Sequence, residues 1–241
     1  MSQPYRLTPM NAWHQRHGGN MKMLDGWKRV QSYGNLPGEE TAILEAVGIC
    51  DVTPCAKLTV EGKNSGEMVR TLTGSKNLMP GTCITPKLLE SDLDNIQIAC
   101  LSPENFLILG PPGKERDLMR HLKNYACVHT CTHMMDVTSA YAAIQLAGPH
   151  AGALLRRMSA AQFAAVLPDN CVQTKVAGVK ALCIHQNVHQ GNAWVCLVAR
   201  DFGEYVWESI VESGKEFGVQ PFGFMTANAV ISAEKNDVAA L

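Results

Sequence analysis

The chain has 241 residues, of which 46% are hydrophobic and 18% are charged, and its formal net charge is -1. Such a composition is typical of a globular protein that buries a sizeable core. Lysine and arginine are spread along the chain, so no basic patch is available for nucleic acid or an anionic membrane. We therefore expect neither of them as a partner.

The N-terminus and the cysteines both favour a reducing compartment. The first ten residues lack the basic start, apolar run and cleavage site of a secretory signal, and no stretch reaches the roughly 18 apolar residues of a spanning helix. Nine cysteines, an odd number, are scattered through apolar segments, which suits small reduced core residues better than a disulfide framework. We expect a cytoplasmic protein.

The first strong periodic segment predicts a helix over residues 39–47. It places Ile43, Leu44 and Val47 on one face and ends at Gly48, a residue that accepts the left-handed cap conformation. A helix followed by a strand is expected here.

The central part of the chain alternates between short strands and helices. A strand at 58–60 precedes a helix at 63–72, and a strand at 95–101 pairs with one at 106–109 as a hairpin. A helix follows at 114–125, where the apolar residues recur at helical spacing.

The last third of the chain continues the same alternation. Strands are expected at 142–146, 176–184 and 193–199, and an amphipathic helix at 204–217. The spacing is not that of a regular parallel βαβ sheet, so the class is α+β.

Domain organisation is read from the absence of repeats and linkers in the sequence. Gly and Pro fall singly between the periodic segments, as in a compact mixed domain. The prediction is one domain spanning 1–241, with two small domains as the alternative.

Five short motifs stand in a fixed order along the chain. They are HGGNM at 17–21, AVGICDVT at 46–53, KLTVEG at 57–62, IQLAGPHA at 144–151 and FGVQPFG at 217–223. Their order and spacing resemble those of the aminomethyltransferase (glycine-cleavage T-protein) family. The resemblance implies antiparallel sheets and flanking helices around a central cavity for tetrahydrofolate. Family members continue into a C-terminal barrel domain, so the chain is expected to be the folate-binding domain without that barrel.

The family's acidic pair is altered. Its second member lies near the folate nitrogen that receives the carbon, and here the pair is Asp94 and Asn95. Asparagine can hold a hydrogen bond but cannot carry a negative charge or relay a proton. The resemblance thus makes Asn95 a candidate catalytic position, while Asp94 is expected on the opposite face of the strand.

Other folate contacts that the resemblance implies are also replaced. A Tyr and a Glu that grip the pterin correspond to Val188 and Val195, a family Arg corresponds to Ala227, and a family Tyr falls near Thr85. Each buried polar group left without a partner costs about 1–3 kcal/mol. Tight folate binding therefore requires replacement groups, and Thr85 is one candidate.

The segment that carries two of these replacements offers new polar and aromatic groups: His185, Asn187, His189 and Trp194. Trp194 can stack on a ring, while the imidazoles donate or accept hydrogen bonds. We predict His189 as a catalytic residue beside Asn95, and the other three as cofactor-binding residues.

Residues 127–133, CVHTCTH, form the most suggestive metal pattern. Alternate residues of a strand share a face, so two Cys and two His could point the same way. Four ligands in a straight row extend over roughly 20 Å, too far for one ion. The prediction is that no metal is bound.

Three further polar residues have structural interpretations. His14 and His17 lie in the N-terminal segment and are interpreted as solvated or capping histidines. Asp51 is expected to accept a hydrogen bond from nearby backbone.

Three functions remain open on these residues. The leading hypothesis is a tetrahydrofolate-dependent transferase that moves a methyl or aminomethyl unit from a small-molecule methyl or amine donor, as a demethylase or dehalogenase would. The second is a non-catalytic subunit of an oxidase or dehydrogenase, resembling the small subunit of heterotetrameric sarcosine oxidase. The third is a small-molecule or lipoyl-protein binder. A partner subunit or a homo-oligomer fits each of them.

Overall fold

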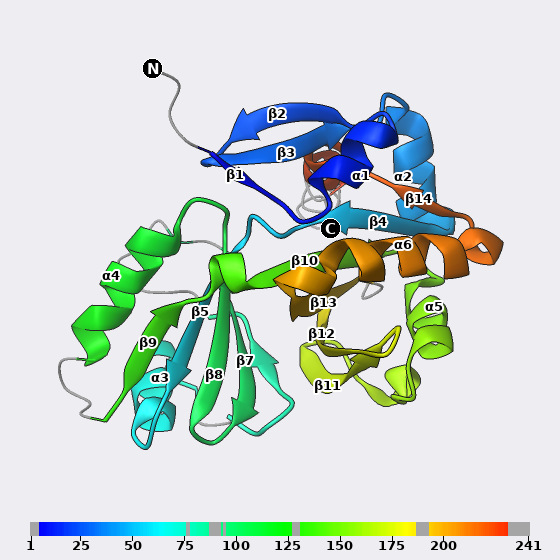
Figure 1. Ribbon diagram of the computed structural model, residues 1–241. Coiled ribbons are helices and arrows are strands. Elements are labelled where there is room, and N and C mark those ends of the chain that lie inside the picture. Colours follow the sequence, from blue (N-terminus) through cyan, green and yellow to red (C-terminus); the bar gives the residue numbers. More distant parts are fainter. Residues whose placement is uncertain are drawn as a thin grey trace, which may run out of the picture. The chain divides into compact units, whose positions relative to one another are not determined.

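The computed structural model divides the chain into two compact units, which we call the major and the minor unit (Figure 1). The structure describes residues 5–75, 78–86, 93, 95–126, 131–186 and 193–230. The major unit comprises residues 1–53, 141–168 and 172–241, and the minor unit comprises residues 54–140 and 169–171.

The major unit is built on a six-stranded sheet in the order β11-β12-β13-β10-β4-β14. Its strands are β4 (Val47–Asp51), β10 (Tyr141–Ala147), β11 (Asn170–Val176), β12 (Val179–Gln186), β13 (Ala193–Ala199) and β14 (Val219–Pro221). The ladders β12–β13, β13–β10 and β10–β4 are antiparallel, and β14 adds to β4 in parallel.

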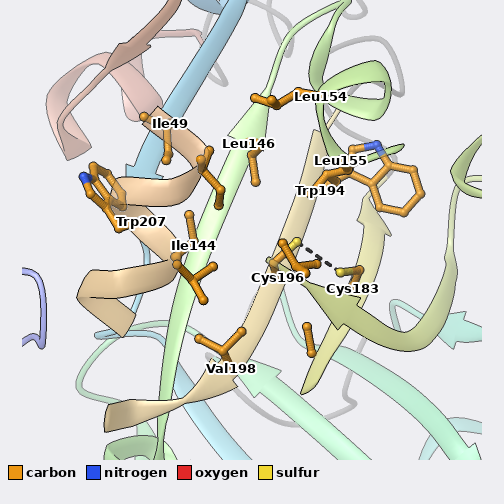
Figure 2. Packing of buried hydrophobic residues seen from close by; sticks show 14 of the residues in the cluster. Ile49, Ile144, Leu146, Leu154, Leu155, Cys183, Trp194, Cys196, Val198 and Trp207 are labelled. Carbon is orange, nitrogen blue, oxygen red and sulfur yellow. Dashed lines mark hydrogen bonds between the residues drawn. The ribbon is translucent and has the colours of Figure 1, made fainter. Parts of the chain in front are cut away.

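Helices α5 (Ala151–Met158) and α6 (Gly203–Ser213) cover one face of this sheet. Figure 2 shows the resulting core, in which Leu154 and Leu155 of α5 and Trp207 of α6 pack on the side chains of β10, β12 and β13. The apolar contacts of this layer are the main reason the helices stay on the sheet, because burial of such side chains contributes about 1.5–3 kcal/mol each.

Helix α2 (Leu36–Glu45) and residues 224–230, which are also helical, pack on another apolar cluster of the major unit. Its members are Ile43, Cys50, Ala147, Ala193, Phe222 and Val230. This cluster takes residues of β4, β10 and β13 that are absent from the α5 and α6 core, so both faces of the sheet carry apolar side chains.

A three-stranded sheet near the N-terminus completes the major unit, with α1 (Asn11–Arg16) beside it in sequence. Its strands are β1 (Arg6–Leu7), β2 (Asn20–Leu24) and β3 (Trp27–Ser32). Asp25 and Gly26 connect β2 to β3 with φ angles of 55° and 74°. Positive φ at both central residues is the requirement of a two-residue hairpin turn, which Asp-Gly meets well.

The minor unit has a five-stranded sheet in the order β6-β7-β8-β5-β9, with α3 (Ser65–Thr73) and α4 (Glu115–Ala126) on its core face. Its strands are β5 (Ala56–Glu61), β6 (Cys83–Ile84), β7 (Gln97–Ser102), β8 (Asn105–Gly110) and β9 (His133–Asp136). Short 3₁₀ turns lie at Thr138–Ala140 in this unit, and at Phe163–Ala165, Arg200–Phe202 and Lys215–Phe217 in the major unit.

The predicted α+β class is confirmed, as is the hairpin that β7 and β8 form. The predicted end of the helix over 39–47 is wrong, because α2 ends at Glu45 and Val47 begins β4. Leu44, expected on the inward face, is 61% exposed. Pairing of β4 with β10 on one side and β14 on the other overrides the helical periodicity at Val47.

The single strand expected over 176–184 is also wrong. Two strands are present, β11 and β12, and Ala177 and Gly178 turn the chain between them with φ angles of 50° and 81°. An alanine at positive φ is uncommon, so a sequence pattern gives little reason to place a turn there.

The single domain over 1–241 stays a prediction. The chain forms two compact units, and each unit has its own apolar cluster. In the described part of the chain, no helix is both long enough and apolar enough to cross a membrane.

Candidate functional site

His185 and Trp194 face each other across β12 and β13, near the end of that hairpin. Their rings stack with a centroid separation of 4.1 Å and an angle of 10° between planes, and Phe163 meets the indole edge-on at 5.0 Å. His185 Nδ1 lies 2.7 Å from the carbonyl oxygen of Val166, so this nitrogen carries the proton and donates. The imidazole is therefore fixed in both position and tautomer.

These aromatic side chains line a pocket of about 260 Å³ beside α5. Its described lining includes Gly152, Ala153, Arg156, Phe163, His185 and Trp194. No carboxylate belongs to that lining. Arg156 is exposed and makes no ion pair or side-chain hydrogen bond within the described residues, whereas its neighbour Arg157 pairs with Glu216.

The pocket lies on the face of the sheet that α5 and α6 cover. Trp194 belongs to the core under α5 and α6, and Figure 2 shows it beside Leu155. Val195 is the next residue of β13, and successive side chains of a strand point to opposite faces. Val195, which the resemblance matches to a glutamate of the family, is therefore on the other face from the pocket and is buried.

A second polar cluster joins α1, β4 and Tyr33, the residue that follows β3. His14 is 1% exposed, with Nε2 3.0 Å from Asp51 Oδ2 and Nδ1 2.7 Å from the hydroxyl of Tyr33. The interpretation of His14 as solvated or capping is wrong, because the imidazole is buried against Asp51. That contact spans 37 positions, so no local sequence pattern indicates it. Asp51 Oδ1 does accept from the backbone N–H of Thr53 at 3.0 Å, so that expectation is confirmed.

Burial and hydrogen bonding act in opposite directions on this cluster. Burial alone raises the pKa of Asp51, but the hydrogen bond and positive charge of His14, with the hydrogen bond at Thr53, lower the pKa below its ordinary value. Burial, then the charges of Cys50 and Asp51, raise the pKa of Tyr33 well above its ordinary value. Asp51 is thus an anion and Tyr33 is neutral near neutral pH.

Glu39 extends the polar cluster toward the C-terminal part of the major unit. Its carboxylate accepts hydrogen bonds from the N–H of Tyr33 at 2.6 Å, the N–H of Gly223 at 3.0 Å and the hydroxyl of Thr226 at 2.6 Å. The most distant of these donors, Thr226, lies 187 positions from Glu39 in the sequence. A carboxylate that is 2% exposed and satisfied by three donors has a structural role.

The other predicted site residues lie elsewhere. Asn95 and Thr85 belong to the minor unit, and both are exposed. Asn95 has a φ of 60°, in the left-handed region that asparagine tolerates better than most residues. Asn187 and His189 lie outside the described residues. The structure therefore brings together His185 and Trp194 of the predicted set.

No group of three or more metal-binding side chains occurs among the residues that the structure describes. The CVHTCTH pattern at 127–133 falls largely on residues 127–130, which lie outside this part of the chain.

Sequence reasoning missed Arg156 and Phe163 as pocket residues. The sequence does contain one indication for Arg156. The residues three and four positions away on either side are not acidic, so Arg156 has no ion-pair partner on its own helix.

The chain is thus an α+β protein in which His14 of the N-terminal segment contacts Asp51 and Tyr33. An aromatic pocket lies between α5 and the six-stranded sheet. It belongs to the family described as the GCVT N-terminal domain, whose match spans residues 10–237.

Two proteins with similar sequences illustrate the relatives of this chain. An aminomethyltransferase of Acidobacterium capsulatum is 24% identical over 233 residues, which cover 93% of this chain and 61% of that protein. The chain thus spans about three fifths of the length of this relative. Sarcosine oxidase subunit alpha of Corynebacterium sp. strain U-96 is 23% identical, with 96% of this chain matching 26% of that subunit.

Two solved structures show the same fold. The glycine cleavage system aminomethyltransferase T from Bartonella henselae superposes with a TM-score of 0.82 at 15% identity, covering 93% of this chain and 61% of that one. A chain of the heterotetrameric sarcosine oxidase from Corynebacterium sp. U-96 superposes with a TM-score of 0.60 at 18% identity, covering 77% of this chain and 93% of that one.

Proposed function

We propose that this chain binds a tetrahydrofolate-like carrier and takes part in transfer of a methyl or aminomethyl unit from a small-molecule donor. The family match over residues 10–237 is the observation that supports this proposal most strongly. The fold superposes over 93% of this chain and 61% of the aminomethyltransferase T from Bartonella henselae, so this chain shares the fold of the part that it matches.

The described residues fit such a carrier only in part. Val195 is buried, and Ala227 is partly buried against an apolar cluster. The resemblance implies charged contacts at both positions, and these apolar side chains offer a pterin edge no ionic partner. Asn95 and Thr85 offer an amide and a hydroxyl on exposed segments. We propose that these two residues position the carrier through proximity and hydrogen bonding and without a proton relay. Asn187 and His189 stay predicted contacts.

The prediction from the sequence that His185 and Trp194 also contact the carrier stays a prediction, and the carrier site proposed here is built without them. Their pocket lies on the face of the sheet opposite Val195.

The alternative is a non-catalytic subunit of a multi-subunit oxidase or dehydrogenase. The superposition that covers 93% of a chain of heterotetrameric sarcosine oxidase favours this second candidate, because it shows that a chain of similar extent occurs within an assembly. The loss of charge at Val195 and Ala227 is also compatible with a pocket that no longer works on a carrier.

Calorimetric titration with tetrahydrofolate separates the two candidates. The carrier proposal predicts a Kd on the order of 1–100 μM. Asn95→Gly removes the side chain while keeping the left-handed backbone, which alanine would strain. We expect this variant and Thr85→Ala to weaken binding several-fold, and the His189→Ala variant to do the same.

The matched control is Thr71→Ala, which removes an exposed hydroxyl from α3 of the same unit and should leave the affinity unchanged. Absence of binding up to millimolar tetrahydrofolate would contradict the carrier proposal. The subunit proposal instead predicts that the protein isolated from its host carries a flavin-containing partner chain.

A further inference from the structure

The pocket beside α5 lies on the face of the sheet opposite Val195, a position where the resemblance implies a carrier contact. Trp194 and Val195 are neighbours on β13 and point to opposite faces of the sheet. The pocket is lined from the Trp194 side, between the β12–β13 hairpin and α5. It therefore offers a second place for a ligand, independent of the proposed function.

The lining combines flat aromatic walls with one cation. Phe163, His185 and Trp194 present rings, while Gly152 and Ala153 leave space because their side chains are small. Arg156 supplies a permanent positive charge with no ion pair among the described residues. A guanidinium over such a pocket matches a carboxylate in a planar, two-hydrogen-bond geometry.

The size of the pocket limits the ligand. Its volume of about 260 Å³ lies just under the range of about 300–1,000 Å³ that holds drug-sized molecules. A single aromatic ring that carries one carboxylate is of suitable size, whereas a folate with its long tail is not.

The aromatic wall is also already in place. The stacking of His185 on Trp194 and the hydrogen bond of His185 to the Val166 carbonyl hold both rings without a ligand. Binding then requires little ordering of the protein, which reduces its entropic cost.

We propose that this pocket binds a small planar aromatic monocarboxylate, with Arg156 contacting the carboxylate and the His185–Trp194 pair packing against the ring. The probe pair is nicotinate and nicotinamide, which share a ring and differ in charge. In calorimetric titrations, nicotinate is expected to bind at least about tenfold more tightly than nicotinamide, a difference of about 1.4 kcal/mol.

Variants of α5 test the contact with the carboxylate. Arg156→Gln should remove the preference for nicotinate, whereas Arg157→Gln, on the same helix but paired with Glu216 and outside the pocket lining, should retain it. Ala153→Leu fills the pocket and should abolish binding of both probes while the circular dichroism spectrum stays unchanged.

Three results would overturn the proposal: no binding of nicotinate at about 10 mM, equal affinity for the two probes, or a preference that survives Arg156→Gln. Failure of the carrier proposal can be distinguished from failure of this one. Tetrahydrofolate binding is measured on the Asn95 and Thr85 variants, and its affinity should not change in Arg156→Gln.

Discussion

Two regions of the major unit bury similar polar and aromatic side chains but treat them differently. Around His14 and Asp51, the buried charged groups have partners within the protein, and the segments they join are held in place. Around His185 and Trp194, the rings are fixed but a cavity remains, and Arg156 has no ion pair among the described residues. The hydrogen-bonded network of His14 and Asp51 indicates a structural role. The open pocket, lined by a guanidinium without an ion pair among the described residues, indicates a ligand site.

The largest effect should come from His14→Ala, which leaves the buried Asp51 carboxylate without its imidazole partner. An uncompensated buried charge costs about 3–5 kcal/mol, so the free energy of unfolding in urea should fall by that amount. A loss below about 1 kcal/mol would show that the network is solvated and not closed.

The matched control is Arg157→Ala, which breaks the exposed ion pair with Glu216. Both side chains of this pair are in water, so the midpoint of unfolding should not shift measurably. An equal loss of unfolding free energy in His14→Ala and Arg157→Ala would contradict the distinction between the buried and the exposed contact.

Glu39→Ala should have the next largest effect. It leaves three donors without their acceptor, those of Tyr33, Gly223 and Thr226. We expect a loss of about 2–4 kcal/mol, since each unsatisfied buried donor costs about 1–3 kcal/mol and water can reach some of them. Glu39→Gln, which keeps two acceptor lone pairs, should lose less, and the order of the two variants in urea unfolding is the check.

Acid should weaken the closed network in a defined direction. The pKa of Asp51 is lowered in the folded protein, so its contribution to stability is present above the unfolded pKa, about 3.9, and is lost as pH falls through the folded value. Urea unfolding between pH 7 and pH 3 should show this loss, and His14→Ala should reduce it. An unchanged pH dependence in the variant would contradict the assignment.

The smallest change in stability is expected at the open pocket. A Cβ added at Gly152 would lie 3.7 Å from Trp194 Nε1, an ordinary contact. Gly152→Ala should therefore leave the melting temperature unchanged or raise it slightly, because alanine is favoured over glycine in a helix by about 1 kcal/mol. The same methyl group narrows the pocket, so nicotinate affinity should fall. Improved affinity would be inconsistent with the proposed binding mode.

Local periodicity was sufficient for much of the fold. The hairpin of β7 and β8 and the helix over residues 114–125 follow from apolar spacing and turn residues, and both are present. The position of Val47 does not follow, because its strand depends on pairing with β10, about a hundred residues later. The turn at Ala177 needs a positive φ that alanine rarely adopts.

The candidate site was predictable only where its residues are close in sequence. His185 and Trp194 are predicted together because one short segment of the sequence carries both, and the β12–β13 ladder pairs them. Phe163 and Arg156 join them through the packing of α5, and His14 meets Asp51 across 37 positions. Such contacts depend on tertiary structure and leave no pattern in a single sequence.

The most direct test is a titration of tetrahydrofolate into the free protein and into protein saturated with nicotinate. The account predicts the same Kd for tetrahydrofolate in both, because the proposed carrier contacts, Asn95 and Thr85, are not among the residues that line the pocket of the aromatic acid. A carrier affinity that falls in proportion to nicotinate occupancy would contradict it, since the two ligands would then share the pocket of His185 and Trp194.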